Sequence, residues 1–421
     1  MACRKDTEIL SVVHPICCGL DVHKQFVSAC LLVQEPSGTI REEIKEFGTF
    51  TDQLLSLKSW LTENSCPVVA IESTGVYWHP VHNVLEGRLR VVLVNARHVK
   101  NVPGRKTDVS DSKWLAGLLR HGLLRGSFIP PRHVRQWRQL WILRTSMVQT
   151  LGDFKRRVHK HLESASIKID SVASTLFSVT GRNLMQLLLS EQGEITREAV
   201  EQCARTGLKE KAHELCRAMQ GFLTDHDRWM LSILLSMVWT IEKKIEDIDR
   251  RMECLMVDNT ETLVRLDQVP GINEVAARGI LSIIGPDLSV FPTEGHFCSW
   301  AGLCPGNNRT AGKRKSSRSP VQKHPLKTLL VEVAWAATKK KDSYYRDKYF
   351  RLKSRIGPKP AIYAIAHRIG KAIYHIVKEG QEFKDLGLDY LSGRNQQAKL
   401  KRLKNMAKSM GYTLAPVQVA V

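Results

Sequence analysis

The chain has 421 residues, with 63 Lys and Arg against 42 Asp and Glu, which gives a formal net charge of +21. This length is enough for two or three domains with a substantial core. The charge is uneven, because 26 basic and only 7 acidic residues fall between Ala301 and Val421. Such asymmetry is typical of a protein that binds a polyanion, most often nucleic acid.

The composition argues against three classes of protein. The 10 cysteines form no C-x-x-C pair and no cluster with histidine at zinc spacing, which argues against structural zinc and indicates a reducing compartment. The N-terminal residues are mixed polar, unlike a signal peptide. No apolar run approaches the about 18 residues of a membrane span. We therefore expect a cytoplasmic protein.

The first 130 or so residues alternate strand and helix patterns. Residues 16–33 predict two strands joined by a polar turn, and residues 50–61 predict a helix. Residues 66–74 (CPVVAIEST) form a buried-type strand, and a short helix at 79–85 precedes a further strand at 91–96. This alternation predicts an α/β sheet covered by helices on both faces.

Four acidic residues mark the ends of these elements. Asp21 and Glu72 each close a strand, and Asp108 and Asp111 open the following helix pattern. Three residues of spacing put the last two carboxylates on one helix face, one turn apart. Alone, such a pair simply favours a helix N-terminus. Four acids at these places predict convergence at one sheet edge, and carboxylate oxygens favour Mg²⁺.

The middle of the chain, from about Val134 to Val257, is mostly helical by pattern. One segment, Trp137 to Leu162, is rich in Arg, Lys and His. A second segment has a heptad seam with charged residues on its outer positions. The pattern favours pairing between subunits, and an intramolecular bundle is the alternative. The seam consists of Leu231, Leu234, Val238, Ile241, Ile245, Ile248, Met252 and Leu255.

The C-terminal third contains two candidate phosphate-binding turns. The Val-Pro-Gly-Ile turn at 269–272 precedes an amphipathic helix, which is typical of a helix-hairpin-helix or of a plain turn between helices. The loop from Pro305 to Pro325 places hydroxyls, including Thr310 and Ser316, among cations. Such a hydroxyl could attack a phosphate, or the loop could only bind one. Helices are predicted at 326–337 and 361–378, and the Lys-rich tail is expected to be loose or a basic arm.

At this point the residues resemble a known family, the DEDD-type insertion-sequence transposases of the one-hundred-and-ten family, which are bridge-RNA-guided recombinases. The resemblance covers about residues 16 to 380. It implies a ribonuclease-H/Holliday-junction-resolvase-like α/β domain at 1–132, a helical coiled-coil linker at 133–258, a mainly α transposase domain at 259–390 and a basic tail at 391–421. It is carried by GLDVHK, AIESTGVYW, KTDVSDSKWLAGLLRHGLLRGSFIPP, VPGI, WAGLCPGNN, AGKRKS and AIAHRI.

The resemblance also implies the chemistry and the partners. Its acidic tetrad, with one or two Mg²⁺ ions, falls on Asp21, Glu72, Asp108 and Asp111, and its nucleophile is a serine of the C-terminal domain. Donor DNA and target DNA would both pair with a structured bridge RNA, and the protein would work as a homodimer or tetramer at a prokaryotic nucleoid. Basic residues expected at nucleic acid are Arg105, Lys106, Lys313, Arg314, Lys315 and Arg318.

One departure from the family concerns the nucleophile. Thr310 stands directly before AGK, where the family has serine, and SSRSPVQKHPLK replaces the expected Gly- and Lys-rich stretch. The β-methyl of threonine restricts χ1 and crowds an in-line attack. Thr310 could be a poorer nucleophile, Ser316 or a neighbour could replace it, or this copy could be an impaired RNA- and DNA-binding protein. A Mg²⁺-dependent junction resolvase that uses water is a further alternative to the recombinase.

Overall fold

The computed structural model describes residues 11–73, 75–95, 99, 111–190, 195–305, 308–310, 313–316, 324–387 and 390–413. At 206, 308–310, 313–316, 392–399 and 401 this description covers the backbone alone. The chain divides into two compact units, Met1–Ile129 and Pro130–Val421. Each is described by itself, and the finer four-part division of the sequence stays a prediction.

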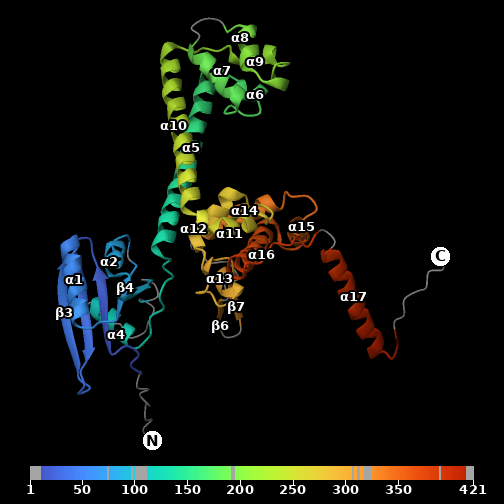
Figure 1. Ribbon diagram of the computed structural model, residues 1–421. Coiled ribbons are helices and arrows are strands. Elements are labelled where there is room, and N and C mark those ends of the chain that lie inside the picture. Colours follow the sequence, from blue (N-terminus) through green and yellow to red (C-terminus); the bar gives the residue numbers. More distant parts are fainter. Residues whose placement is uncertain are drawn as a thin grey trace. The chain divides into compact units, whose positions relative to one another are not determined.

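The N-terminal unit is built on a five-stranded mixed sheet in the order β3-β2-β1-β4-β5 (Figure 1). The first three strands pair antiparallel, whereas β1–β4 and β4–β5 pair parallel. This confirms the predicted α/β sheet. The bounds of the strands are β1 (Ile16–Val22), β2 (Phe26–Gln34), β3 (Ile40–Gly48), β4 (Val68–Glu72) and β5 (Arg90–Val94).

Strand β3 was not predicted from the sequence, for a physical reason. It is an edge strand whose side chains are mostly exposed, so its sequence, IREEIKEFG, is charged rather than apolar. Only Phe47 is buried, and its ring lies 5.4 Å from that of Trp60. An edge strand with one buried side chain has no period-2 hydrophobic pattern to detect.

Helices cover both faces of the sheet, as predicted. Helices α1 (Thr51–Glu63) and α2 (Trp78–Leu85) pack on one face, where Leu20, Leu31 and Leu57 share a core. Helix α4 (Asp111–Arg120) packs on the other face, over a core that includes Cys17, Val68 and Leu115. Alternation along the strands therefore assigns each strand residue to the α1/α2 face or to the α4 face.

The position of α4 depends on a glycine in β1. A Cβ atom at Gly19 would lie against the Ser112 carbonyl oxygen and 2.5 Å from the Ala116 backbone nitrogen. The backbone of α4 therefore rests directly on the backbone of β1 at this point. The Ser28 and Ser112 hydroxyls, 3.1 Å apart, connect the start of α4 to β2 as well.

The second unit begins with a long pair of helices, α5 (Arg132–Ser164) and α10 (Asp225–Leu255), which lie side by side in Figure 1. The segment between them forms short helices. These share a core with Val158 and Leu162 of α5 and Leu235 of α10. They are α6 (Ile169–Val172), α7 (Val179–Ser190), α8 (Arg197–Cys203), the 3-10 turn η1 (Thr206–Leu208) and α9 (Ala212–Met219).

The predicted seam of α10 is buried within this chain. Ile248 and Met252 pack with Val134 and Trp137 of α5, which corrects the expectation that the seam pairs between subunits. The seam also shifts slightly, since Leu235 rather than Leu234 is fully buried. The oligomeric state itself stays a prediction.

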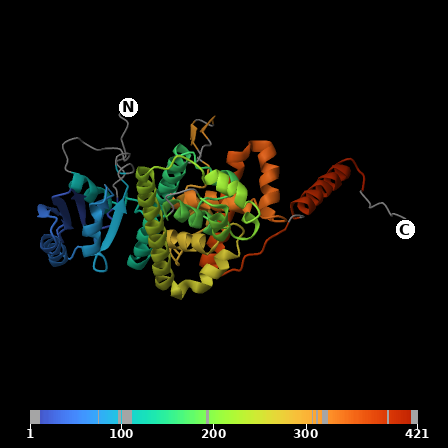
Figure 2. The same cartoon turned by 90° about the horizontal axis from the view of Figure 1, so that it is seen from above.

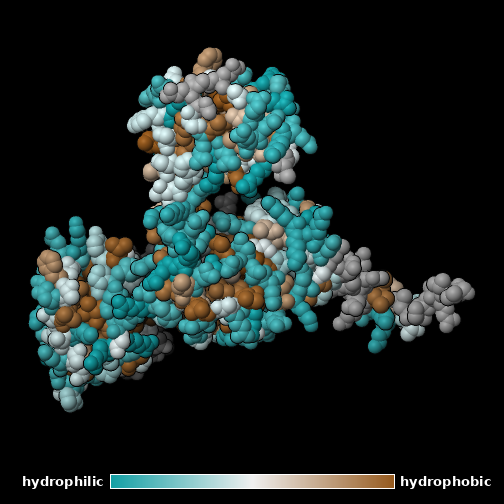
Figure 3. Space-filling model, turned by 45° about the horizontal axis from the view of Figure 1, so that its top comes forward, coloured by the Kyte–Doolittle hydropathy of each residue, from teal (hydrophilic) through white to brown (hydrophobic). Residues whose placement is uncertain are grey.

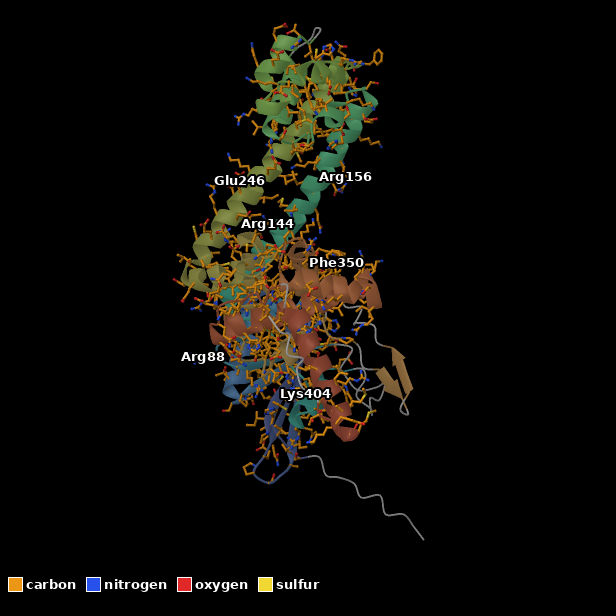
Figure 4. All side chains as sticks on the ribbon, turned by 90° about the vertical axis from the view of Figure 1, so that its right-hand side faces the viewer. Arg88, Arg144, Arg156, Glu246, Phe350 and Lys404 are labelled. Carbon is orange, nitrogen blue, oxygen red and sulfur yellow. The ribbon has the colours of Figure 1, made fainter. Side chains whose placement is uncertain are left out.

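Charged pairs hold the same two helices together along their length. The Arg144 guanidinium donates to both carboxylate oxygens of Asp249, at 2.6 and 3.0 Å (Arg144 is labelled in Figure 4). Nearer the short helices, Glu242 accepts ion pairs from Lys155 at 2.9 Å and from Arg182 at 2.8 Å. Bidentate geometry fixes the register of the helices as well as stabilising the pair.

The remaining helices form the C-terminal part of the second unit, in which α14 and α16 pack closely. Its elements are η2 (Val257–Asn259), α11 (Thr260–Asp267), α12 (Glu274–Ile284), α13 (Glu294–Trp300), the hairpin β6 (Asn308–Thr310) and β7 (Lys313–Ser316), α14 (Pro325–Ala337), α15 (Tyr344–Ile356), α16 (Pro358–Glu379) and α17 (Tyr390–Ser409).

Two expectations for this part need correction. The stretch from Pro305 to Pro325 contains a two-stranded hairpin rather than only a loop. The Lys-rich tail is helical in α17, drawn in red near the C-terminal end of the chain in Figures 1 and 2, so it is not a loose segment, and its role as a basic arm stays a prediction. Figure 3 shows a largely hydrophilic surface over the described residues, and none of their helices is long and apolar enough to cross a membrane.

The glycine contact of α4 makes a stability prediction. Gly19→Ala should lower the free energy of unfolding of the N-terminal unit by about 1–3 kcal/mol, because the added methyl group pushes α4 off β1. Gly117→Ala is the matched control within α4, since its Cβ would meet nothing within 4 Å. It should be neutral or stabilising by about 0.5–1 kcal/mol. Hydrogen exchange of β1 and α4 measures both, and equal protection in the two variants would contradict the close contact.

The seam makes a second prediction. Ile241→Lys with Ile248→Lys should destabilise the α5–α10 pair by more than about 3 kcal/mol, because two buried side chains become charged. The control is Ile233→Lys with Met237→Lys, at positions 47% and 40% exposed on the same helix. Circular dichroism should show a loss of helix in the first variant only. If the Ile241→Lys, Ile248→Lys variant stays fully helical and light scattering shows only that its oligomer dissociates, the result would support pairing of the seam between subunits.

Candidate active site

Two of the predicted acids lie on neighbouring strands at one edge of the sheet. Leu20 of β1 is in parallel register with Ile71 of β4, so Asp21 and Glu72 follow side by side. Cys17 and Val68 belong to the core under α4, and alternation puts Asp21 and Glu72 on that same face. The strand pairing thus brings together two carboxylates that are 51 residues apart in the sequence.

The start of α4 brings a third acid to this edge. Asp21 pairs in register with Ser28 of β2, and the Ser28 hydroxyl contacts Ser112. Asp111 is the first residue of α4 and directly precedes Ser112. Because Ser112 contacts the strand partner of Asp21, Asp111 lies at the end of the sheet where Asp21 lies. The three acids come from two strand ends and one helix start, as the sequence predicted.

A histidine that the sequence reasoning did not single out contacts this group. His23 Nε2 lies 3.1 Å from the Asp21 carboxylate, and the imidazole packs 4.5 Å from the Phe26 ring. The Asp21 side chain is 26% exposed, whereas that of His23 is 51% exposed. His23 can orient the carboxylate through this contact. The sequence could have indicated this contact, because His23 follows the predicted site residue Asp21 by only two positions.

The fourth acid, Asp108, lies outside the described residues, as do Arg105 and Lys106. Among the described residues, no three His, Cys, Asp or Glu side chains are grouped closely enough to hold a metal ion. The chemistry of the donor set nevertheless suits Mg²⁺, which prefers carboxylate oxygens and keeps several waters. The expectation of a Mg²⁺ site is therefore supported by the carboxylate chemistry of the residues at this edge.

The second unit presents the candidate nucleophile on a basic hairpin. Thr310 ends β6 and pairs with Lys313, the first residue of β7, while Arg309 pairs with Arg314. The backbone therefore places the hydroxyl-bearing residue beside cationic positions. The side chains of this hairpin, including Lys315 and Ser316, and the whole of Arg318 lie outside what the structure describes.

A half-buried histidine follows this hairpin at the start of α14. Burial, together with the nearby Arg138 guanidinium, lowers the pKa of His324 to about 4, so its ring is neutral at physiological pH. The ring packs edge-on against Trp300, with centroids 4.5 Å apart. Arg138 donates to the Ile283 carbonyl. No sequence signal distinguished His324, because its burial arises from α5 and α13.

The Val-Pro-Gly-Ile turn joins α11 to α12, which confirms a turn between two helices, and the choice between a helix-hairpin-helix and a plain turn stays open. Gly271 has φ +87°, and a Cβ there would lie against the Val333 carbonyl and 2.6 Å from the Ala337 nitrogen. Asn273 caps α12 by accepting from the Ala276 amide at 2.9 Å. The glycine is thus explained by close packing on α14, and phosphate binding by this turn stays a prediction.

Comparison with protein families gives two matches. Residues 18–167 match the model of the IS110-type DEDD transposases, described as "Transposase", and residues 264–350 match the "Transposase IS116/IS110/IS902 family". A search of curated proteins found no significant match. The two family matches together span more than half of the chain and agree with the α/β unit and the helical unit described above. The chain therefore belongs to the IS110 family of DEDD transposases.

Proposed function

We propose that this transposase cuts and rejoins DNA by metal-assisted transesterification. The acids that would hold the metal are Asp21, Glu72, Asp108 and Asp111. The observation that carries the proposal is the strand register, which puts Asp21 and Glu72 side by side on the face where α4 begins at Asp111. Mg²⁺ bound by such carboxylates supplies polarisation of the scissile phosphate.

The chain's own residues then have distinct roles. The acids hold negative charge at one sheet edge, and His23 keeps the Asp21 carboxylate oriented through the 3.1 Å contact. Basic residues hold flanking phosphates, and those on the hairpin are favoured by its register with Thr310. They are Arg105, Lys106, Lys313, Arg314, Lys315 and Arg318.

Thr310 is the proposed nucleophile. Its hydroxyl loses a proton and attacks the scissile phosphorus, forming a Thr–phosphate ester while the bond to the 3′ oxygen breaks. The departing 3′ oxygen takes up a proton and becomes a free hydroxyl. A 3′-hydroxyl of the partner strand then attacks the ester, which rejoins the DNA and frees Thr310. Bond energy is conserved because one phosphodiester replaces another at each step.

We also propose that a structured RNA selects the sites. Base pairing by such a guide would carry the sequence specificity, so the protein needs mainly contacts with backbone phosphates. The excess of basic residues after Ala301 supports this, since it fits a large polyanionic partner. The family membership supports DNA as the substrate.

The metal role predicts the effect of neutralising an acid without changing its volume. Asp111→Asn, or Asp21→Asn, should abolish Mg²⁺-dependent DNA cleavage while leaving thermal unfolding and RNA binding unchanged. Asp52→Asn is the control, because Asp52 is an acid in the first turn of another helix, α1. Gel analysis of cleaved plasmid measures the activity. Full activity of both site variants would remove these carboxylates from the mechanism.

The nucleophile proposal predicts a ranking of hairpin variants. Thr310→Ser should retain or raise activity, because it keeps the hydroxyl and removes the crowding methyl group. Thr310→Val should eliminate the covalent protein–DNA adduct, which denaturing gels detect, and Ser316→Ala should have a milder effect.

Other outcomes point to other functions. An active Thr310→Val with an inactive Ser316→Ala would move the nucleophile along the hairpin. Mg²⁺-dependent cleavage with free ends and no adduct would indicate a junction resolvase that uses water. Activity that appears only with Thr310→Ser would identify an impaired copy.

A further inference from the structure

A pocket in the C-terminal part of the second unit is lined by none of the residues proposed to cut DNA. It has a volume of about 320 Å³ and lies between α15, α16 and the extended segment 381–387 that follows α16. This volume is in the range of small-ligand sites. One wall includes Arg368, part of the AIAHRI segment, to which the proposed chemistry assigns no role.

The pocket has an aromatic wall that is held rigidly. Tyr345 and Phe383 are stacked, with ring centroids 6.1 Å apart and planes tilted by 19°. The Tyr344 and Tyr345 side chains are only 7% and 4% exposed, so packing fixes their rotamers. The Tyr344 amide donates to Asp385 at 3.0 Å, as does the Gly387 amide at 3.1 Å, and these bonds attach the segment to α15.

Another wall carries two cations from α16. Arg368 and Lys371 follow one another along a single stripe of this helix with His375, and all three side chains line the pocket. The Arg368 guanidinium lies 5.8 Å from the centre of the Tyr344 ring. Glu294 of α13 contacts Lys371 at 3.0 Å and His375 at 3.4 Å, which holds both side chains in place.

We infer that this pocket binds one unpaired nucleotide of a single-stranded nucleic acid. Aromatic rings beside cations are the combination that stacks a base and holds its phosphate. Acceptors on the same lining, Glu382 and Asp385, suit the amino groups of a base and disfavour a purely anionic ligand. The inference depends on the chain acting on nucleic acid, but not on which residues cut it.

The test measures binding without metal or cleavage. Anisotropy of a labelled 12-nucleotide single strand in EDTA gives the Kd for the full chain. Arg368→Glu and Phe383→Ala should each raise this Kd by about fivefold to a hundredfold, the range expected for losing one stacked base. Phe383→Tyr keeps an aromatic ring and should bind as tightly as wild type, unlike Phe383→Ala. A strand carrying a photoreactive base should crosslink to the peptide that contains Phe383.

Matched controls distinguish binding in this pocket from non-specific binding to the positively charged surface. Lys359→Glu makes the same kind of charge reversal at an exposed position of α16 outside the pocket. Phe350→Ala removes an exposed aromatic ring of α15, labelled in Figure 4, that does not line the pocket. Both should bind within about twofold of wild type, and unchanged thermal unfolding of all variants excludes a folding defect.

Two further binding measurements identify the ligand. Ribose and deoxyribose strands of the same sequence distinguish RNA from DNA, and tighter binding of either supports the inference. AMP that binds as tightly as the strand and is not displaced by it would overturn the inference in favour of a free nucleotide. Wild-type affinity of Arg368→Glu and Phe383→Ala for both strands would also overturn it. Because cleavage is not involved, these failures would leave the proposed function standing.

Discussion

The contact of α4 with β1 at Gly19 is the constraint on which the N-terminal unit depends. A helix backbone lies at this point against a strand backbone, with no side chain between them. The close approach carries Ser112 to the Ser28 hydroxyl and thereby places Asp111 at the edge where Asp21 and Glu72 end their strands. A longer side chain at position 19 would separate the helix from the sheet, and the three acids would no longer share one edge.

The second unit is organised by a different interaction, the pairing of α5 with α10. Apolar side chains are buried at both ends of this pair, and the bidentate Arg144–Asp249 contact lies at the level of the core that includes Ile248 and Met252. The apolar ends supply burial, whereas the charged pair selects one register of two long helices. A heptad seam can therefore serve a helical hairpin within one chain as well as a coiled coil between chains.

The chemistry that the chain offers nucleic acid is divided among features of different kinds. Carboxylates at the sheet edge of the first unit suit a divalent cation. In the second unit, the hairpin presents Thr310 in register with Lys313, and the pocket beside α16 combines fixed aromatic rings with Arg368. Basic charge alone would attract any polyanion. Under the two proposals, the hairpin and the pocket add positions that hold a single phosphate or a single base.

The amino-acid sequence by itself determined much of this protein. Strand and helix periodicity predicted the α/β sheet, and the acids at the strand ends predicted that Asp21 and Glu72 lie on neighbouring strands, because residue type and spacing carry that information. Tertiary structure alone decided the rest. Edge strand β3 has no apolar period, and the seam of α10 looks the same whichever chain covers it.

The pocket and the environment of His324 also needed the fold. The pocket forms where α15, α16 and the segment 381–387 pack together, and His324 contacts Trp300 of α13 and lies near Arg138 of α5. Local patterns report which face of an element is buried, but not what buries it. Tertiary packing determines which element covers that face. It also sets the environment on which the protonation state of a side chain depends.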